Sequence, residues 1–523
     1  MFARKCSKFK FCIAFGLGFY LSTPYSFAVQ TNEEGKKSMS TTTTQSKTIP
    51  KKITTPDVVN TRIGTLKFFD GFPTDETVEK LYDNLDFMRG VECFLNFVPM
   101  ASLEGLRRGF ADVNVDQCNK VVIFDELMDS NPLFLTGNTD TVYAGAMLDL
   151  ERDGPTVIEV PPNCGPGTVN DAYFRFVTDM GIPGPDAGKG GKYLVLPPDY
   201  SGETPDGYFV STSTSYTNLL LLRGFLVDGK TEAATKNFKE GLKIYPLAKK
   251  DSTPNMEFIN GSRKVFNTIH ANDYSFYEEI DTVFQKEPVS LLDPELRGLA
   301  ASIGIEKGKK FAPDAQMRKT LTEAAAVGNG TARAIAFKFR DKNAYFYEGS
   351  NWYTGFVGGD YKWLKDEGKG GRNLDARTFF FYIATINTPA MVKKMVGKGS
   401  QYALAVRSKD GNYLDGSKTY KLNIPANVPA KDFWSLVVYD PQSRSELRTS
   451  QPFPSKNSKR SNLVVNKDGS TTVYFGPKSP EGKEQNWIET VPEKGWMVLL
   501  RLYGPLEPWF DKTWKPGEIE ALD

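Results

Sequence analysis

Histidine is almost absent from this sequence, because its 523 residues include only one, His270. A zinc site built from several histidines is therefore excluded, as is any catalytic group that needs two imidazoles. A Ser-His-Asp triad would have to use His270, but no Gly-x-Ser-x-Gly motif supplies a matching nucleophile. His270 lies in "NTIHANDYSF", just before a segment with helical spacing, so we interpret it as a loop or capping residue. Any catalysis must then rest mainly on carboxylates, tyrosines and arginines.

Cysteine is also scarce, and none of the five cysteines forms a Cys-x-x-Cys pair. Cys6 and Cys12 lie in the N-terminal segment described next, which leaves Cys93, Cys118 and Cys164. The pattern fits either a disulfide between Cys93 and Cys118 or three buried thiols. Spacing does not decide between them, since a disulfide needs Cα atoms within about 7 Å of each other.

The sequence has no apolar run long enough to span a bilayer, which takes about 20 residues, so we expect no stable membrane span. The apolar run at residues 11–21 follows a basic stretch and precedes a small-x-small site at Ser26-Phe27-Ala28. This order is typical of a secretory signal peptide, and we expect residues 1–28 to direct the protein to the periplasm or out of the cell. The alternative is an uncleaved N-terminal anchor.

The sequence also has no large excess of positive charge. The whole chain carries a net charge of +2, and residues 1–28 contain four bases and no acid, so the net charge without them is −2. No basic patch interleaved with aromatic residues stands out, and nucleic acid is not expected as a partner.

Composition and periodicity divide the rest of the chain into a leader and three parts. Residues 29–56 are rich in Ser, Thr, Lys and Gln, which predicts a disordered leader. Residues 57–229 predict a β-rich module that opens with an amphipathic helix, from a Thr74 cap to Pro99. The strands expected after this helix are residues 156–160, 172–179, 192–198 and 207–215.

A helical connector is predicted over residues 230–395. Helix starts are expected at Asn272, at Asp293-Pro294 and at Pro313, and a further apolar helix over 374–392. Residues 396–523 then predict an antiparallel sandwich or jelly roll, with a hairpin turn at Asp468-Gly469. Its expected strands are 402–408, 433–440, 462–466, 471–476 and 496–504. The expected fold class is α+β, with two β-rich modules joined by the connector.

The segment "KDGNYLDGS" offers oxygen ligands at Asp410, Asn412 and Asp415 that could hold calcium. Two Asx-Gly turns flanking a hairpin explain the same residues, and the glutamate that completes an EF-hand loop is absent. We favour the turns and expect neither a cofactor nor a metal.

Tryptophans crowd the second half of the chain, where their rings could stack on a sugar or a lipid-like ligand. They could equally be core residues, and Trp434 and Trp496, which lie inside apolar strands, are expected to be buried.

Several stretches resemble one bacterial family, which pairs an N-terminal domain of unknown function 1254 with a C-terminal domain of unknown function 1214. In chain order they are "GNTDTVYAGAMLDL", "FRFVTDMGIPGPDAGKGGKYLVLPPDY", "LDARTFFFYIATINTPAM", "LDGSKTYKLNIPANVPAKDFWSLVVYD", "GKEQNWIET" and "RLYGPLEPWFDKTW". The resemblance implies a β-rich first module and a sandwich as the second, and it carries no agreed set of catalytic residues.

Polar residues inside these stretches are the candidates for a site. The catalytic candidates are Asp140, Tyr143, Arg175 and Arg501, and the ligand-binding candidates are Asn138, Asp179, Asp375, Arg377 and Tyr503.

Two functions remain open from the sequence. The first is an exported hydrolase in which Asp140 is the acid or base, Tyr143 a proton donor or orienting group, and Arg175 or Arg501 stabilises negative charge. The second is a non-catalytic protein with a cleft that binds a small molecule, a glycan or envelope material. Sheet edges also leave room for a homo-oligomer.

The hydrolase hypothesis requires Asp140 and Tyr143 to reach the same site. In a regular strand starting at Asp140, Asp140 and Tyr143 point to opposite faces, so a joint site requires the preceding turn to redirect Asp140.

Overall fold

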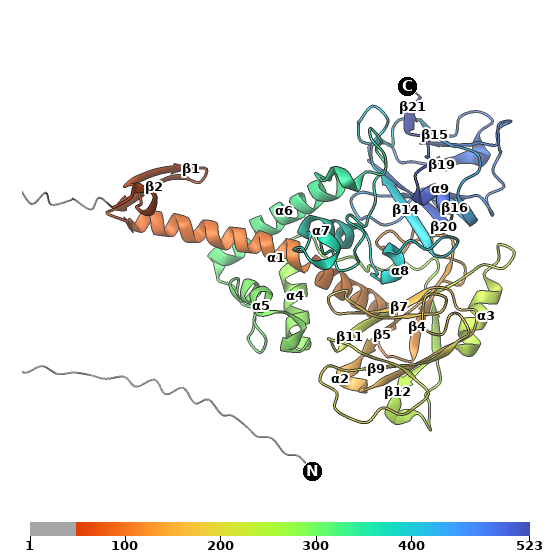
Figure 1. Cartoon of the computed structure of the whole chain (residues 1–523), viewed down its shortest axis with the longest axis horizontal. Coiled ribbons are helices and arrows are strands. Elements are labelled where there is room, and N and C mark those ends of the chain that lie inside the picture. The colour runs from red at the N-terminus through yellow and green to blue at the C-terminus, as the bar shows by residue number, and fades with distance from the viewer. Residues whose placement is uncertain (1–48, 523) are drawn as a thin grey trace, which may run out of the picture.

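The computed structural model describes residues 49–522, in which two β-rich modules lie side by side and a helical arm extends away from them (Figure 1). The predicted signal peptide and most of the predicted leader lie outside the described residues. The far end of the arm carries a small antiparallel sheet of β1 (Val58–Thr61), β2 (Gly64–Phe69) and β3 (Phe72–Pro73). The predicted α+β class is confirmed.

The first module consists of two sheets packed face to face. The larger sheet has the strand order β13-β4-β5-β11-β7-β8, and the smaller has the order β10-β9-β6-β12. Alternate residues of β5 and β11, such as Ala144 and Leu220, share a core with Ile158 and Val195 of the smaller sheet. The elements are β4 (Lys120–Ile123), β5 (Val142–Asp149), α2 (Leu150–Asp153), β6 (Thr156–Val160), β7 (Gly167–Asp171), β8 (Phe176–Met180), β9 (Gly191–Leu196), β10 (Phe209–Thr212), β11 (Thr217–Gly224), α3 (Glu232–Gly241), β12 (Lys243–Pro246) and β13 (Glu257–Asn260).

This module continues past the predicted boundary at residue 229. Strand β12 pairs with β6, and β13 pairs with β4. The predicted strand over 172–179 begins only at Phe176, because Asp171 accepts the backbone N–H groups of Tyr173 and Arg175 and closes a turn there. Side-chain turn chemistry outweighs the strand pattern at this point.

The first long helix runs well beyond its predicted end. Helix α1 (Asp75–Asp112) begins at the predicted cap, where Thr74 Oγ1 accepts the Thr77 N–H at 3.3 Å, but it continues through Pro99. Proline removes the N–H that would bond to the carbonyl of Leu95. The Thr378 hydroxyl donates to that carbonyl instead, at 3.1 Å, so no buried acceptor is left open. Tertiary packing thus replaces the missing helical bond.

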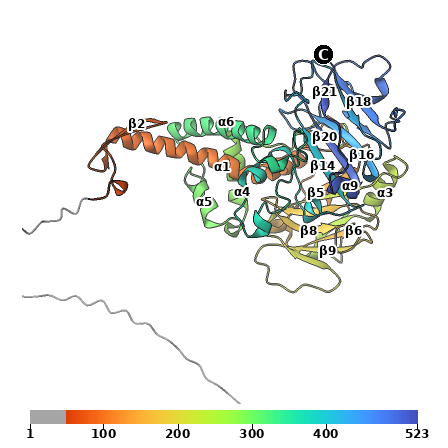
Figure 2. The same cartoon turned by 45° about the horizontal axis from the view of Figure 1, so that its top comes forward.

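All helices of the connector except the short last one pack along α1 and form the arm and its base (Figure 2). The connector helices are α4 (Ser275–Lys286), α5 (Pro294–Ala301), α6 (Ala315–Phe337), α7 (Leu374–Ile383) and α8 (Pro389–Val392). The Asp293 cap is confirmed, since its carboxylate accepts the Leu296 N–H at 2.9 Å. The prediction of a single helix over residues 374–392 is wrong, because residues 384–388 are not helical and separate α7 from α8. None of the helices in the described part of the chain is long and apolar enough to cross a membrane.

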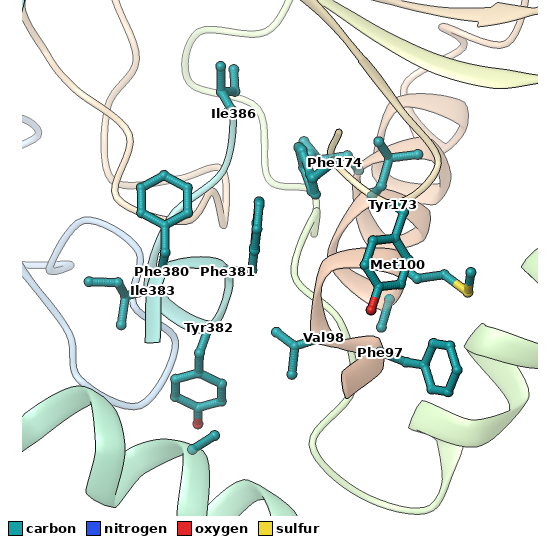
Figure 3. Packing of buried hydrophobic residues seen from close by; sticks show 14 of the residues in the cluster. Phe97, Val98, Met100, Tyr173, Phe174, Phe380, Phe381, Tyr382, Ile383 and Ile386 are labelled. Carbon is teal, nitrogen blue, oxygen red and sulfur yellow. The ribbon is translucent and has the colours of Figure 1, made fainter. Parts of the chain in front are cut away.

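The aromatic end of α7 lies in the centre of the largest core. Phe381 points toward Phe174, with ring centroids 5.3 Å apart, and both face the middle of α1 around Val98 and Met100 (Figure 3). This core joins α1 and the connector to both β modules.

The C-terminal module is a two-sheet sandwich. One sheet is antiparallel, with the order β14-β20-β16-β17, and the other has the order β19-β18-β15-β21. In the second sheet β18 and β19 run parallel, so the module is not wholly antiparallel as predicted. Its elements are β14 (Ser400–Ala405), β15 (Tyr420–Ile424), β16 (Ala430–Tyr439), β17 (Ser455–Asn457), β18 (Thr471–Gly476), β19 (Trp487–Glu489), β20 (Met497–Pro505), α9 (Glu507–Phe510) and β21 (Ile519–Ala521).

The strand predicted over 462–466 does not form. The side chain of Asn486 accepts the N–H of Val464 at 2.9 Å and donates to its carbonyl at 2.8 Å. These two bonds supply partners for the N–H and the carbonyl of Val464, which a neighbouring strand would otherwise provide. The segment therefore forms a loop.

Candidate functional site

A partly open cavity lies where the large sheet of the first module faces the β14-β20-β16 sheet of the second. It has two adjoining parts of about 70 Å³ and 220 Å³. Five residues line both parts, and they come from β11, β14, the break between α7 and α8, and α8 itself: Leu221, Arg223, Tyr402, Ile386 and Met391. The site is therefore assembled from both modules and the connector.

Strand pairing places the polar residues of the cavity in two rows. Arg223 of β11 is the cross-strand partner of Tyr143 of β5, and Tyr402 of β14 is the partner of Arg501 of β20. Partners in adjacent strands point to the same face of a sheet. The two rows face each other across the interface, since all four side chains line the smaller part of the cavity.

The two guanidinium groups have no acidic partner. Arg501 donates through Nη2 to the carbonyls of Thr136 at 2.6 Å and Gly137 at 3.0 Å and to the Tyr439 hydroxyl at 2.8 Å, while its buried Nε has no partner. Arg223 Nη1 lies 3.5 Å from the Tyr402 hydroxyl. Within residues 49–522, neither arginine has a carboxylate oxygen within 4 Å, so neither forms an ion pair, although the charge of the buried Glu446 acts on Arg501 from farther away.

The rings around these arginines are cation–π partners. The Cζ atom of Arg223 lies 5.5 Å from the Tyr143 ring centroid, and that of Arg501 lies 5.2 Å from the Tyr402 ring centroid. Burial alone would raise the pKa of Tyr402, but Arg223 and Arg501 outweigh it and lower that pKa below its ordinary value. For Tyr143 burial prevails over the same arginines, and its pKa is raised. Tyr402 is therefore the more acidic of the two phenols that line the cavity.

Asp140 does not line the cavity. Its carboxylate lies in the C-terminal module, where Oδ2 accepts from the Ser435 hydroxyl at 2.5 Å and from the Tyr503 hydroxyl at 3.2 Å. Oδ1 accepts from Asn457 Nδ2 at 2.8 Å and lies 3.6 Å from Arg460 Nη2. Asp140 is 1% exposed and both of its carboxylate oxygens accept hydrogen bonds from the C-terminal module. Its role in the structure is to link the two modules, and it is not an acid or base open to a ligand.

The turn before β5 produces this arrangement. Asn138 Oδ1 accepts the backbone N–H groups of Asp140 at 2.8 Å and Thr141 at 3.1 Å, and Asn138 Nδ2 donates to the Tyr143 hydroxyl. The turn directs Asp140 into the second module while Tyr143 stays on the cavity face. The structure therefore does not bring Asp140 and Tyr143 together. Asn138 is bonded to Tyr143 and Tyr503 to Asp140, and neither Asn138 nor Tyr503 lines the cavity.

Asp179 lies in the larger part of the cavity. Its Oδ2 accepts from the Thr388 hydroxyl at 2.9 Å, and its buried Oδ1 has no partner. Burial raises the pKa of Asp179 to about 6, against the opposing effect of Thr388 and other neighbours.

The remaining candidates lie elsewhere. Arg175 and Arg377 line a separate cavity, while Asp375 forms an ion pair with Arg340 at the surface, at 2.6 Å. His270 is buried against Phe94 and Phe276, and burial together with Arg444 lowers its pKa to about 3.

Other expectations concern metal, thiols and tryptophans. Asp415 Oδ1 accepts the Ser417 N–H in a turn, and residues 49–522 contain no cluster of three His, Cys, Asp or Glu side chains arranged to hold a metal ion. Cys93, Cys118 and Cys164 are buried and unpaired, so the disulfide does not form. All tryptophans except Trp487 are buried, and no tryptophan platform for sugars is exposed.

Sequence reasoning missed Arg223, Tyr402 and the break between α7 and α8. Arg223 ends the apolar strand "TNLLLLRG". Arg501 was chosen as a polar residue in a family-like stretch, whereas a search for single arginines inside apolar strands would have found both Arg501 and Arg223.

Two residues that line the smaller part of the cavity are β-branched and have positive φ, Thr136 at +39° and Ile386 at +70°. Such backbone is costly for β-branched residues, and it persists where surrounding contacts enforce it, often at functional sites. Arg501 supplies one such contact, through the carbonyl of Thr136.

Comparisons with known proteins agree with this two-module architecture. Residues 118–246 match the family described as Protein of unknown function (DUF1254), and residues 399–507 match Protein of unknown function (DUF1214). No curated protein matches the chain. A crystal structure of a Vibrio parahaemolyticus protein is similar over 84% of this chain and 100% of its own, with 16% identity and a TM-score of 0.51, which shows a shared fold. A putative uncharacterized protein from Burkholderia cenocepacia aligns over 85% of this chain and 97% of its own, at 13% identity and a TM-score of 0.39.

Proposed function

Because this chain belongs to the family that pairs domains of unknown function 1254 and 1214, whose descriptions record no activity, we propose its function from the cavity itself. We propose that the protein binds an organic anion, a carboxylate with an apolar body, between its two modules. Arg223 and Arg501 hold the carboxylate, and the apolar walls enclose the body.

One observation carries this proposal: the guanidinium groups of the buried Arg501 and the half-buried Arg223 face one cavity, and no carboxylate of residues 49–522 forms an ion pair with either. Buried charges are stable when they are paired and hydrogen-bonded. The open Nε of Arg501 is a donor that a ligand oxygen could satisfy. Guanidinium groups bind carboxylates through parallel N–H bonds, which makes a carboxylate the matching partner.

Apart from its arginines and tyrosines, the smaller part of the cavity favours an apolar body. Its walls include Phe134, Phe356, Phe380, Leu404 and Leu499, which offer carbon surface rather than hydrogen bonds. A sugar would leave most of its hydroxyl groups unpaired against these walls, at a cost of about 1–3 kcal/mol for each group. This contrast favours a fatty or aromatic acid over a glycan.

A hydrolase is the second candidate, and Tyr402 is the observation in its favour. A phenol whose pKa is lowered by two arginines is a suitable general base, and the same arginines would stabilise a developing oxyanion. Asp140 takes no part in this version, since its carboxylate is fully engaged outside the cavity. Turnover of aryl or alkyl esters that depends on Tyr402, measured with Tyr402→Phe, would support the hydrolase.

Calorimetric titration tests the binding proposal. Fatty acids and substituted benzoates are titrated into the protein beside their uncharged methyl esters, and we expect saturable binding of the acids only. Removing one partner of a hydrogen-bonded charge pair inside an interface costs about 2–5 kcal/mol, so Arg223→Met should raise Kd about 30-fold. Arg340→Met at the surface is the matched control and should leave Kd unchanged. Equal binding of acids and esters, or an unchanged Kd in Arg223→Met, would disprove the assignment.

Export is proposed on the N-terminal segment alone, whose order of basic, apolar and small residues is typical of a signal peptide. Fractionation of cells that express the full chain, followed by N-terminal sequencing of the product, tests it. We expect a start at Val29 outside the cytoplasm.

A further inference from the structure

A second cavity, of about 330 Å³, lies apart from the one between the modules. It is bounded by the turn between β7 and β8, by the segment around Trp363 and by the first turn of α7. Tyr173, Phe174 and Phe381, which lie together in Figure 3, provide its apolar surface. Its polar lining is dominated by positive charge.

Three arginines reach this cavity from different elements. Arg377 of α7 is 5% exposed, and Arg175 and Arg372 lie nearer to solvent. The Cζ atoms of Arg175 and Arg377 lie 5.1 Å and 6.0 Å from the ring centroid of Tyr173. Lys362, which is exposed, adds a fourth cation to the lining.

The bonds these arginines make are to neutral acceptors. Arg377 Nη2 donates to Asn96 Oδ1 at 2.6 Å, Arg175 Nη1 donates to the Leu291 carbonyl at 2.6 Å, and Arg372 Nη1 donates to the Lys362 carbonyl. In the part of the chain that the structure describes, none of the three has a carboxylate oxygen within 4 Å. Burial and the nearby charges of Arg377 and Arg175 lower the pKa of Arg372, as expected for cations held together.

The acids that line the cavity are already engaged. Asp171 accepts through Oδ1 from the N–H groups of Tyr173 at 2.8 Å and Arg175 at 2.7 Å, and through Oδ2 from the Thr214 hydroxyl at 2.5 Å. Asp293 caps α5. Neither acid has an oxygen within 4 Å of a guanidinium nitrogen of the three arginines, although the charges of Asp171 and Arg175 act on each other.

Three buried polar atoms of the lining residues have no partner: Arg377 Nε, Trp363 Nε1 and Asn387 Oδ1. Their side chains are 5%, 3% and 4% exposed. Buried donors and acceptors without partners are rare in proteins, and each needs an explanation. Two of the three are donors, which fits a ligand rich in acceptor oxygens.

We propose that this cavity is a second ligand site and that it binds the phosphate group of a small phosphate monoester. A phosphate group brings close to two negative charges and three strong acceptor oxygens, which match several guanidinium groups better than one carboxylate does. Arg377 and Trp363 bind it from the inside and Arg175 and Arg372 from the mouth, while Asn387 accepts from a hydroxyl group of the ligand.

Titration with glycerol phosphate and with inorganic phosphate tests the proposal by calorimetry. We expect saturable binding of at least one of them and, because Arg372 is exposed and its loss should not disturb folding, a Kd at least tenfold higher in Arg372→Gln. Arg377→Gln should raise Kd further. Arg223→Met in the first cavity should leave phosphate binding unchanged, which separates the two proposals.

The pH dependence is a further readout. A phosphate monoester loses its second proton at about pH 6, so binding should weaken as the pH falls below that value. Binding of glycerol phosphate but not inorganic phosphate would identify the ester as the ligand, whereas equal binding would reduce the site to a phosphate site. No saturation at about 1 mM, or the same Kd in Arg372→Gln and the parent protein, would overturn the proposal.

Discussion

Asp140 receives donors from Ser435, Asn457 and Tyr503 and lies near Arg460, all of them in the C-terminal module. In Asp140→Asn the charge is lost and an amide N–H replaces one acceptor, so one of these donors faces another donor. Breaking a buried ionic network by removing one partner typically costs about 3–5 kcal/mol. We expect a loss of that order in urea unfolding, with the Kd of the organic acid unchanged because Asp140 does not line the cavity.

Asp375→Asn is the matched control for this prediction. Its ion pair with Arg340 is at the surface, where such pairs contribute about 0–1 kcal/mol. An Asp140→Asn protein that is as stable as Asp375→Asn would show that the network does not fasten the modules.

Glu287 predicts a pH dependence of stability. Its carboxylate accepts the N–H groups of Tyr216 and Thr217, and burial raises its pKa from 4.5 to about 7. Between these two values the folded protein holds a proton that the unfolded chain has released, so this group's contribution to stability falls as the pH rises from about 4.5 to 7. The change is about 3 kcal/mol at most.

Glu287→Gln removes this pH dependence, but its amide NH2 replaces one of the two oxygens that accept backbone N–H groups. We expect the variant to be less stable than the parent at pH 4.5, and the difference in the free energy of unfolding to shrink by pH 8, because only the parent loses stability as the pH rises. Urea unfolding at both pH values measures the difference, and a constant difference between the two proteins would contradict the pKa shift.

At the scale of single elements, Pro99 and Thr378 predict a coupled pair of substitutions. Thr378→Val keeps the shape of the side chain but leaves the Leu95 carbonyl without its donor, which should cost about 1–3 kcal/mol. In a Pro99→Ala background the helix supplies its own N–H to that carbonyl, so the same Thr378→Val change should cost much less. A double-mutant cycle measures the coupling, and additive costs would show that the two positions act independently.

The same pair shows what local patterns predict and what they miss. The caps at Thr74 and Asp293 are confirmed because capping depends on neighbours within a few residues. The end of α1 was predicted wrongly because the donor that makes Pro99 tolerable comes from Thr378, far along the chain. The missing strand at 462–466 has the same origin, since the partner of Val464 is Asn486. The predicted α+β class is still correct, because it depends on all the predicted helices and strands and not on any single one of them.

For the candidate sites too, local patterns identify single residues but not the contacts between residues that are distant in the sequence. Tyr143, Arg501 and Asp179 could be selected as polar residues in characteristic stretches, and the structure places all three at the first cavity. Their grouping with Arg223 and Tyr402 depends on strand pairing and on two sheets facing each other, which no local pattern encodes. Asp140 was ranked beside them because adjacency in sequence does not reveal that a turn sends it into another module.

At the scale of the whole molecule, the shared core predicts cooperative unfolding. Residues of both modules, among them Tyr143 and Leu499, belong to one hydrophobic cluster, and the segment from Thr136 to Thr141 is bonded into the C-terminal module. We therefore expect one unfolding transition in urea rather than two.

Two natural probes can test this. All tryptophans follow residue 351, so their fluorescence reports on the later part of the chain. Cys118 and Cys164 are buried in the first module, so the reaction of their thiols with a colorimetric reagent reports on its opening. Coincident midpoints are expected, and thiol exposure at a lower urea concentration than the fluorescence change would show that the modules unfold separately.

The break between α7 and α8 is a wall common to the two proposed ligand sites. Ile386 borders the cavity between the modules, and the next residue, Asn387, borders the arginine-lined cavity. Because the two residues are adjacent in the chain, we expect a ligand that moves the backbone of Ile386 to move Asn387 as well. Linkage then makes the effect mutual: if the organic acid changes the affinity for phosphate by some factor, phosphate changes the affinity for the acid by the same factor. Residues 384–388, between α7 and α8, would thus couple ligand binding in the cavity between the modules to ligand binding in the arginine-lined cavity.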